Sequence, residues 1–223
     1  GRNYFDVLKE IINHARYTIH LQTYIFNEDE TGNEIASALI NAAERGVQIF
    51  MVIDGYASRN LSKEFINTLK AAGIQFRWFN PIFKSRYFYF GRRLHHKVVV
   101  ADASVSLVGG INITNRYNDF DEPAWLDWAV HSQGEISQKL NKICVDIWNK
   151  SYWGKKSNTK FKLPVIPKLP SEECFIRARV NDWVRHKSQI SKSYIEMLKK
   201  AQHSITIMSS YFLPGLLIKK NII

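Results

Sequence analysis

The sequence predicts an α/β protein in which helices pack against a central mixed, largely parallel sheet. From residue 5 to residue 79, amphipathic segments alternate with short segments rich in β-branched and aromatic residues. This alternation is typical of βαβ units, whose crossover helices cover a parallel sheet. Hydrophobic residues make up 45% of the 223 positions and aromatic residues 13%, which is enough apolar material to form a core.

Each predicted element follows from its residue pattern. Apolar residues at helical spacing predict a first helix over residues 5–15, and β-branched and aromatic residues then predict a strand over 17–26. Gly46 and Gly73 each follow an amphipathic segment, and glycine is favoured just after a helix end. The remaining predicted elements are a helix at 31–45, a strand at 47–53, a helix at 61–72, a strand at 74–79, two strands around a turn at Asp102, a strand at 125–131 and a helix at 136–152.

A lysine- and proline-rich segment divides the chain into unequal parts. Residues 154–170 hold five lysines and three prolines, a composition typical of a linker. We therefore predict a first half at 1–153, a linker at 154–173 and the beginning of a second half at 174–223. Within this last part, the pattern predicts a strand at 174–180, a helix at 188–202 and a strand at 204–212.

The chain is strongly basic, with 31 Lys and Arg against 20 Asp and Glu, a formal net charge of +11. This balance favours an anionic partner, either nucleic acid or an acidic membrane surface, and charge alone does not separate the two. Residues 82–93 are both basic and aromatic. We interpret them either as a solvated strand or as a contact for an anionic headgroup or phosphate.

Two further features limit the class of protein. Cys144 and Cys174 are the only cysteines and have no metal-site spacing, which predicts two reduced thiols rather than a disulfide framework or a zinc site. No apolar run approaches the roughly 18 residues of a membrane span. The chain begins at Gly1 without an initiator Met, so a targeting or membrane segment could lie upstream.

The residues with the clearest chemistry lie between His95 and Asn112. In a strand, residues two apart share a face, so His95 and Lys97 are expected to point together and His96 away from them. For this reason a metal site that uses both histidines is disfavoured. If the chain reverses over 103–104, His95 lies opposite Asn112, and Lys97 lies opposite Gly110, which would leave room for a substrate group.

These residue types suit the cleavage of a phosphodiester. An imidazole with a pKa near ~6.5 is substantially neutral at physiological pH and can attack phosphorus, giving a phosphohistidine. Lys97 and Asn112 would stabilise the charge on the phosphate oxygens, so neither a metal nor another cofactor is required. Asp127 is the candidate carboxylate for orienting His95. Asp102 is expected to fix the loop or a strand end rather than to contact substrate.

The spacing His95-x-Lys97-x4-Asp102-x6-Gly109-Gly110-x-Asn112 resembles the signature of the phospholipase D superfamily, and six fixed positions make it a specific motif. Four further segments, at 24–26, 52–55, 92–97 and 211–215, resemble bacterial cardiolipin synthases, especially those without N-terminal membrane helices. The resemblance implies an αβα layered fold of the phospholipase D type. It also implies a peripheral protein at the cytoplasmic face of the bacterial inner membrane that transfers phosphatidyl groups from phosphatidylglycerol.

In that family two such motifs form one active site. One histidine attacks the phosphatidyl phosphorus, while the other protonates the departing glycerol and then activates the incoming alcohol. The resemblance makes His95 the nucleophile or its partner acid, Lys97, Asn112 and Gly110 phosphate contacts, and Asp102 and Asp127 members of the catalytic set.

A second motif is expected outside these 223 residues. A shift of 186 residues places Ala15 on Ala201 and Phe26 on Phe212, which favours an internal repeat. The same shift puts a second motif near residue 281. The chain is therefore interpreted as a piece of a two-motif protein that is inactive alone, or else as a single-motif chain that pairs with a second copy.

Three function classes remain open at this point. The first is a phosphatidyltransferase, and the second is a phosphodiesterase of the same superfamily acting on phospholipid or nucleic acid. The third is a non-catalytic binding module, which the intact His95, Lys97 and Asn112 disfavour. The phosphohistidine step is common to the first two classes, and the resemblance favours lipid as the substrate.

Overall fold

A computed structural model describes residues 1–80, 93–120, 122–149, 174–181, 188–209 and 212–222. It divides into two compact units, Gly1–Cys174 and Phe175–Ile223, which are treated separately below. The basic and aromatic segment at 82–93 lies outside the described residues except for Arg93. The predicted linker at 154–173 lies entirely outside them.

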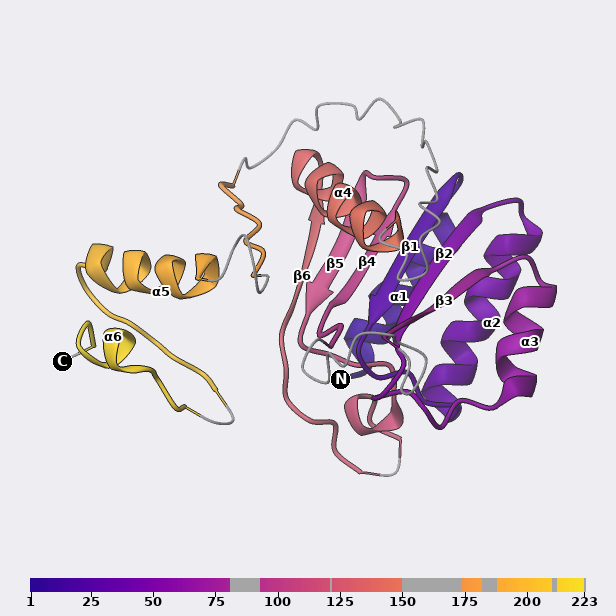
Figure 1. Ribbon diagram of the computed structural model, residues 1–223, viewed down its shortest axis with the longest axis horizontal. Coiled ribbons are helices and arrows are strands. Elements are labelled where there is room, and N and C mark those ends of the chain that lie inside the picture. The colour runs from indigo at the N-terminus through magenta and orange to yellow at the C-terminus, as the bar shows by residue number, and fades with distance from the viewer. Residues whose placement is uncertain (81–92, 121, 150–173, 182–187, 210–211, 223) are drawn as a thin grey trace. The chain divides into compact units, whose positions relative to one another are not determined.

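Six strands of the first unit form one mixed sheet in the order β3-β2-β1-β4-β5-β6 (Figure 1). The strands are β1 (Thr18–Thr23), β2 (Gln48–Asp54), β3 (Gln75–Phe79), β4 (Lys97–Ala101), β5 (Val105–Gly109) and β6 (Ala129–Gln133). β1, β2 and β3 pair in parallel, whereas β4, β5 and β6 add antiparallel pairs. Four strands run in one direction, as a largely parallel sheet requires, but parallel pairing is confined to the three strands joined by crossover helices.

Helices cover both faces of this sheet, giving three layers (Figure 1). The main core joins α1 (Arg2–His14), α2 (Glu30–Glu44) and α3 (Lys63–Ala71) to one face of the sheet. The opposite face carries α4 (Glu135–Asn149), whose Cys144 and Trp148 pack on strand residues. Successive residues of β2 and β4 are buried alternately in the main core and under α4, so both faces of these central strands are apolar. The predicted αβα layering is confirmed.

The turn between β4 and β5 differs from the predicted one. It contains three residues, 102–104, because Ala101 pairs with Val105. Asp102 and Ala103 adopt positive φ angles of 52° and 50°, and the Ser104 N–H donates to the Ala101 oxygen at 3.0 Å. The predicted two-residue turn was therefore wrong by one residue, and the true register brings Gly109, not Gly110, level with Lys97.

The predicted strand at 125–131 begins only at Ala129. The main-chain N–H of Trp125 instead donates to the Arg116 oxygen at 2.9 Å, outside the sheet. Trp125 and Trp128 are exposed, so they belong to the rim rather than to the core.

The second unit contains α5 (Gln189–Lys200) and α6 (Leu216–Lys219). The predicted helix at 188–202 is confirmed. The predicted strands at 174–180 and 204–212 are not formed by the described residues of these ranges. A strand needs a neighbour to satisfy its N–H and C=O groups, and the described residues of this unit offer no sheet for it to join. No helix among the described residues has both the length and the apolar character needed to cross a membrane.

Candidate active site

The candidate residues gather at one edge of the sheet of the first unit. The parallel strands β1, β2 and β3 end there, and because β4 is antiparallel to β1, Lys97 at its start lies beside Thr23. β5 ends and β6 begins at the same edge, where Gly109 pairs with Ala129. Ligands of open α/β sheets bind outside the carboxyl ends of their parallel strands, and this edge is the corresponding place here.

His95 and Lys97 point together, as predicted. The Lys97 Nζ lies 3.3 Å from the His95 Nε2 and 3.3 Å from the His95 main-chain oxygen. His96 points elsewhere, with its Nδ1 3.0 Å from the Oε1 of Gln22, whose Nε2 donates to the Cys144 oxygen of α4. The two neighbouring histidines therefore serve different faces of the sheet and do not share a site.

The surroundings lower the pKa values of both groups. Burial lowers the His95 pKa, the nearby Lys97 charge lowers it further, and Asp54 opposes the change. Lys97 is only 6% exposed, and burial lowers its pKa to about 8, although the negative charge of Asp127 acts in the other direction. His95 is thus favoured in the neutral form that a nucleophile requires, beside a lysine that still carries its charge at neutral pH.

Asn112 and Tyr24 complete this group of side chains. Asn112 is 5% exposed, and its Oδ1 accepts the Ile25 N–H at 3.1 Å. The Asn112 Nδ2 donates to the Tyr117 hydroxyl at 3.3 Å. The Tyr24 ring lies 4.9 Å from the His95 ring and 5.1 Å from the Lys97 Nζ. His95, Lys97 and Asn112 thus all contact the short segment that extends β1.

The space beside Gly110 holds a carboxylate of the protein rather than open room for a substrate. A Cβ added at Gly110 would overlap with the Asp127 carboxylate, and a Cβ at Gly109 would overlap with the Trp128 main chain. The Gly110 N–H also donates to the Trp128 oxygen at 3.2 Å. Both glycines therefore permit the approach of the segment that precedes β6, and the expected room for substrate beside Gly110 is filled.

Asp127 exerts its electrostatic effect on Lys97, whose Nζ lies beside the His95 ring. Its Oδ1 accepts the Trp128 N–H at 2.7 Å, and its charge raises the pKa values of Lys97 and Tyr4. Among the described residues, the carboxylate that acts electrostatically on His95 is Asp54. The structure therefore shows Asp127 as a counter-charge to Lys97.

Asp102 does not join this group. It lies at the far end of β4 from Lys97, where its Oδ1 accepts the N–H groups of Tyr17 and Thr18 and its Oδ2 that of Arg16, each at 2.8 Å. It therefore fixes the start of β1 to the β4–β5 turn, in agreement with the loop-fixing interpretation, and lies away from His95, Lys97 and Asn112. A hollow of about 410 Å³ at that opposite edge is lined by Asp102, Arg16 and His131 and holds none of the residues at the His95 edge.

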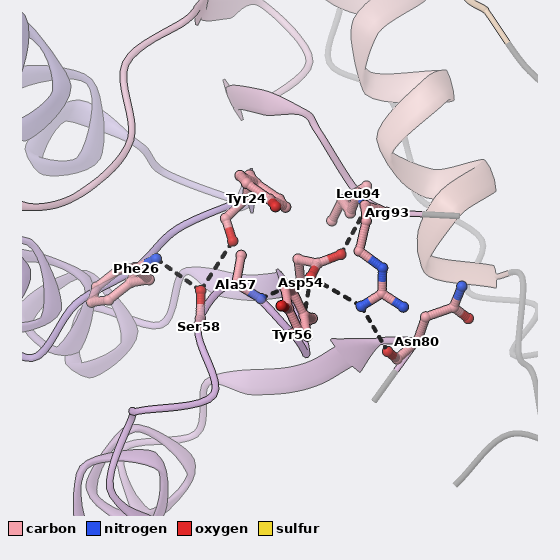
Figure 2. Close-up of polar contacts among 9 residues, drawn as sticks. All are labelled: Tyr24, Phe26, Asp54, Tyr56, Ala57, Ser58, Asn80, Arg93 and Leu94. Atoms are coloured by element: carbon pink, nitrogen blue, oxygen red, sulfur yellow. Dashed lines mark hydrogen bonds and ion pairs between the residues drawn. The ribbon is translucent and has the colours of Figure 1, made fainter. Parts of the chain in front are cut away.

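Asp54, the last residue of β2, is a site residue that the His95–Asn112 motif does not include. Its carboxylate accepts the Leu94 N–H at 2.9 Å and forms an ion pair with the Arg93 guanidinium at 3.3 Å. Figure 2 shows how these residues lie. The feature of the sequence that could have identified Asp54 is its position directly after an apolar strand, because ligands bind at the carboxyl ends of parallel strands. The contact with Leu94 could not be inferred because the two residues are far apart in sequence.

Within the described residues, no group of three or more His, Cys, Asp or Glu side chains is arranged to hold a metal ion. The site consists of an imidazole, a cationic amine and a neutral amide. This set of donors can bind a phosphate group and attack it.

Known proteins match this chain over most of its length. Residues 8–148 match the family described as cardiolipin synthase, PLD-like domain. Cardiolipin synthase B of Shigella flexneri and that of Escherichia coli K12 are each 32% identical over 225 aligned positions, which cover 96% of this chain and 52% of theirs. Cardiolipin synthase 1 of Bacillus anthracis is 27% identical and is covered over 44% of its length. The chain therefore spans about half the length of these relatives.

Solved structures share the fold. A phosphatidylserine synthase of Haemophilus influenzae matches 64% of this chain and 34% of its own, with a TM-score of 0.54 and 24% identity. The phospholipase D family member Nuc of Salmonella typhimurium matches 65% of this chain and 86% of its own, with a TM-score of 0.50 and 22% identity. The chain belongs to the cardiolipin synthase PLD-like domain family of the phospholipase D superfamily.

Proposed function

We propose that this chain supplies one half of the active site of a phosphatidyltransferase, and that the reaction is cardiolipin synthesis from phosphatidylglycerol. The observation that carries the proposal is the convergence of His95, Lys97 and Asn112 on the segment that extends β1. The similarity to curated cardiolipin synthases over 96% of the chain supports lipid as the substrate. The net charge of +11 suits peripheral contact with an anionic membrane surface.

In the proposed reaction, the neutral His95 attacks the phosphorus of one phosphatidylglycerol. The bond from phosphorus to the glycerol headgroup oxygen breaks, a phosphatidyl-histidine forms, and the glycerol leaves with a proton from a second histidine. Lys97 and the Asn112 amide stabilise the non-bridging oxygens as charge accumulates on them. The headgroup hydroxyl of a second phosphatidylglycerol then attacks the intermediate, gives its proton to the second histidine and restores His95.

The second histidine is proposed to come from a repeat of the same domain. The described ends of α1 and α5 support this repeat, because they match at the predicted shift of 186 residues. Ala15 has φ −61° and ψ 138°, and its N–H donates to the Ile11 oxygen. Ala201 has φ −66° and ψ 130°, and its N–H donates to the Met197 oxygen. A domain boundary at residues 154–173 and a pairing of two halves, within one chain or between two, remain part of the proposal.

Replacing the nucleophile tests the catalytic assignment. We expect His95→Ala in the full-length protein to abolish product formation, because no other group then attacks phosphorus. His131→Ala is the matched control, since His131 is exposed on β6 at a different part of the sheet and should retain activity. Wild-type turnover by His95→Ala would overturn the assignment.

A lipid assay tests the substrate. Full-length protein mixed with phosphatidylglycerol vesicles should form cardiolipin and free glycerol in equal amounts, measured by thin-layer chromatography and a glycerol assay. The alternative is a hydrolase, which would release glycerol and phosphatidic acid without cardiolipin. Cleavage of DNA or RNA without any lipid turnover would favour a nuclease that works as a dimer of single-motif chains.

A further inference from the structure

A buried carboxylate, Asp54, connects the chain segments that surround the candidate nucleophile. Asp54 is 0% exposed, and its Oδ1 accepts the N–H groups of Tyr56 and Ala57 at 3.0 Å each. Its Oδ2 accepts the Leu94 N–H at 2.9 Å, and the Arg93 guanidinium lies 3.3 Å from Oδ1 (Figure 2). A buried charge is retained at low cost only when it is paired and hydrogen-bonded, and Asp54 meets both conditions.

The hydrogen bond from Leu94 to Asp54 lies just outside the region in which the chain is paired in the sheet. The ladder between β1 and β4 ends at Lys97, two residues after His95, so the main chain at His95 lies beyond the regular pairing. Leu94 directly precedes His95, and its side chain is buried with Phe50 and Phe79 on β2 and β3. Asp54 therefore fixes the main chain one residue before the imidazole.

A second contact from the same turn reaches the other side of His95. The Ser58 N–H donates to the Asp54 main-chain oxygen at 3.2 Å. The Ser58 hydroxyl donates to the Tyr24 oxygen at 3.0 Å and accepts the Phe26 N–H at 2.9 Å (Figure 2). Because the Tyr24 ring packs against the His95 ring, the turn after β2 fixes both the residue before His95 and the ring beside it.

We propose that Asp54 is a positioning residue for His95, acting through Leu94 and, with Ser58, through Tyr24. This inference rests on the proposed function, in which His95 attacks phosphorus. Asp54 does not contact the reacting atoms in this scheme. Asp54 instead determines how well the His95 imidazole is oriented toward the phosphorus before the reaction begins.

Misplacing a nucleophile lowers the rate of the chemical step more than it lowers substrate binding. Asp54→Asn has nearly the same volume, but its amide has only one acceptor oxygen. When that oxygen serves Tyr56 and Ala57, an NH₂ group faces the Leu94 N–H and the contact is lost. We expect kcat to fall roughly a hundredfold, with KM for phosphatidylglycerol vesicles changed less than about twofold.

Two further variants separate positioning from general destabilisation. Asp29→Asn is the matched control, because Asp29 also accepts main-chain N–H groups, from Gly32 at 3.0 Å and Asn115 at 2.9 Å, without contacting His95 or its neighbours. It should lower Tm and leave kcat unchanged. Ser58→Ala keeps the buried charge, so it tests the proposal if Asp54→Asn does not fold. It should lower kcat roughly tenfold at constant KM.

The outcomes are distinguishable in the full-length protein. Wild-type kcat in Asp54→Asn, or in Ser58→Ala where Asp54→Asn does not fold, would overturn the positioning role. An equal loss of kcat in Asp29→Asn would overturn it as well, because general destabilisation would then explain the effect. If His95→Ala remains active, the proposed function itself fails, whatever the Asp54 variants do.

Discussion

At the scale of single residues, Lys97 is the group whose environment most directly affects chemistry. Its Nζ lies beside the His95 ring and the Tyr24 ring, and its side chain is almost entirely buried. Burial disfavours its charge, while Asp127 partly restores it. The site therefore holds a cation that is close to losing its proton under mildly alkaline conditions.

This environment predicts a bell-shaped dependence of kcat/KM on pH. Activity should fall on acidification as His95 gains a proton, and this limb should lie below pH 6.5 because the His95 pKa is lowered. Activity should fall again above about pH 8 as Lys97 loses its charge. In Lys97→Arg the guanidinium stays charged throughout the alkaline range. The fall in activity near pH 8 should therefore move to higher pH. An unchanged alkaline limb in that variant would assign it to another group.

At the scale of elements, the β4–β5 turn places one motif residue, Asp102, at the opposite end of β4 from Lys97. Asp102 receives three main-chain N–H groups from the junction of α1 and β1. It also adopts a positive φ, which aspartate tolerates better than most residues. The turn therefore connects the first helix to the hairpin whose far end carries Lys97.

Asp102→Asn tests the proposal that Asp102 serves stability alone. The amide leaves at least one of the three N–H groups without an acceptor, so the free energy of unfolding should fall by about 1–3 kcal/mol. Urea unfolding measures the loss, and kcat should be unchanged. Asp6→Asn, at an exposed position of α1, should change stability by less than about 0.5 kcal/mol. A large loss of kcat with normal stability would place Asp102 in the catalytic set.

The sequence predicted most elements of the first unit because their signals are local. Apolar periodicity and the glycines after α2 and α3 identified the helices to within a few residues. The shape of the β4–β5 turn could not be predicted in this way, since Asp102 and Ala103 are not glycine and still adopt positive φ angles. That single extra turn residue also shifted the predicted partners of His95 and Lys97.

The candidate site was predictable only in part, for a related reason. His95, Lys97 and Asn112 lie within one short segment, so their spacing alone identified them. Asp54 contacts Leu94 across the sheet, and that pairing depends on the strand order rather than on any local pattern. The strands expected in the second unit had the right composition, but a strand forms only beside a neighbour.

At the scale of the whole molecule, the two described units differ in how much they bury. The buried hydrophobic residues all belong to the first unit, whereas no described residue from 175 to 222 is buried. Hydrophobic side chains such as Tyr194, Met197 and Phe212 of the second unit are exposed. Burial of apolar surface is the main stabilising contribution to folding, so the stability of this chain should come from the first unit.

Truncation tests this distribution of stability. A protein of residues 1–174 should unfold cooperatively on heating, at nearly the Tm of the 223-residue chain, as measured by circular dichroism. A peptide of residues 175–223 should show no cooperative transition. The 223-residue chain, although folded in its first unit, should not form cardiolipin without a second motif. Cooperative unfolding of the peptide alone would contradict the first expectation, and turnover by the chain alone would contradict the second.

The reversal of direction between β1 and β4 has a practical consequence for engineering. It places Tyr24, Asp54, Lys97, Asn112 and Asp127 along a single border of the sheet. The opposite border holds the bends at Gly46, Gly73 and Gly134, all of which have φ near +90° and open space where a side chain would be. Fluorophores, affinity tags or fused reporter domains attached to exposed residues near these glycines would lie away from His95 and Lys97. The molecule thus offers a place for labelling that is separate from the candidate active site.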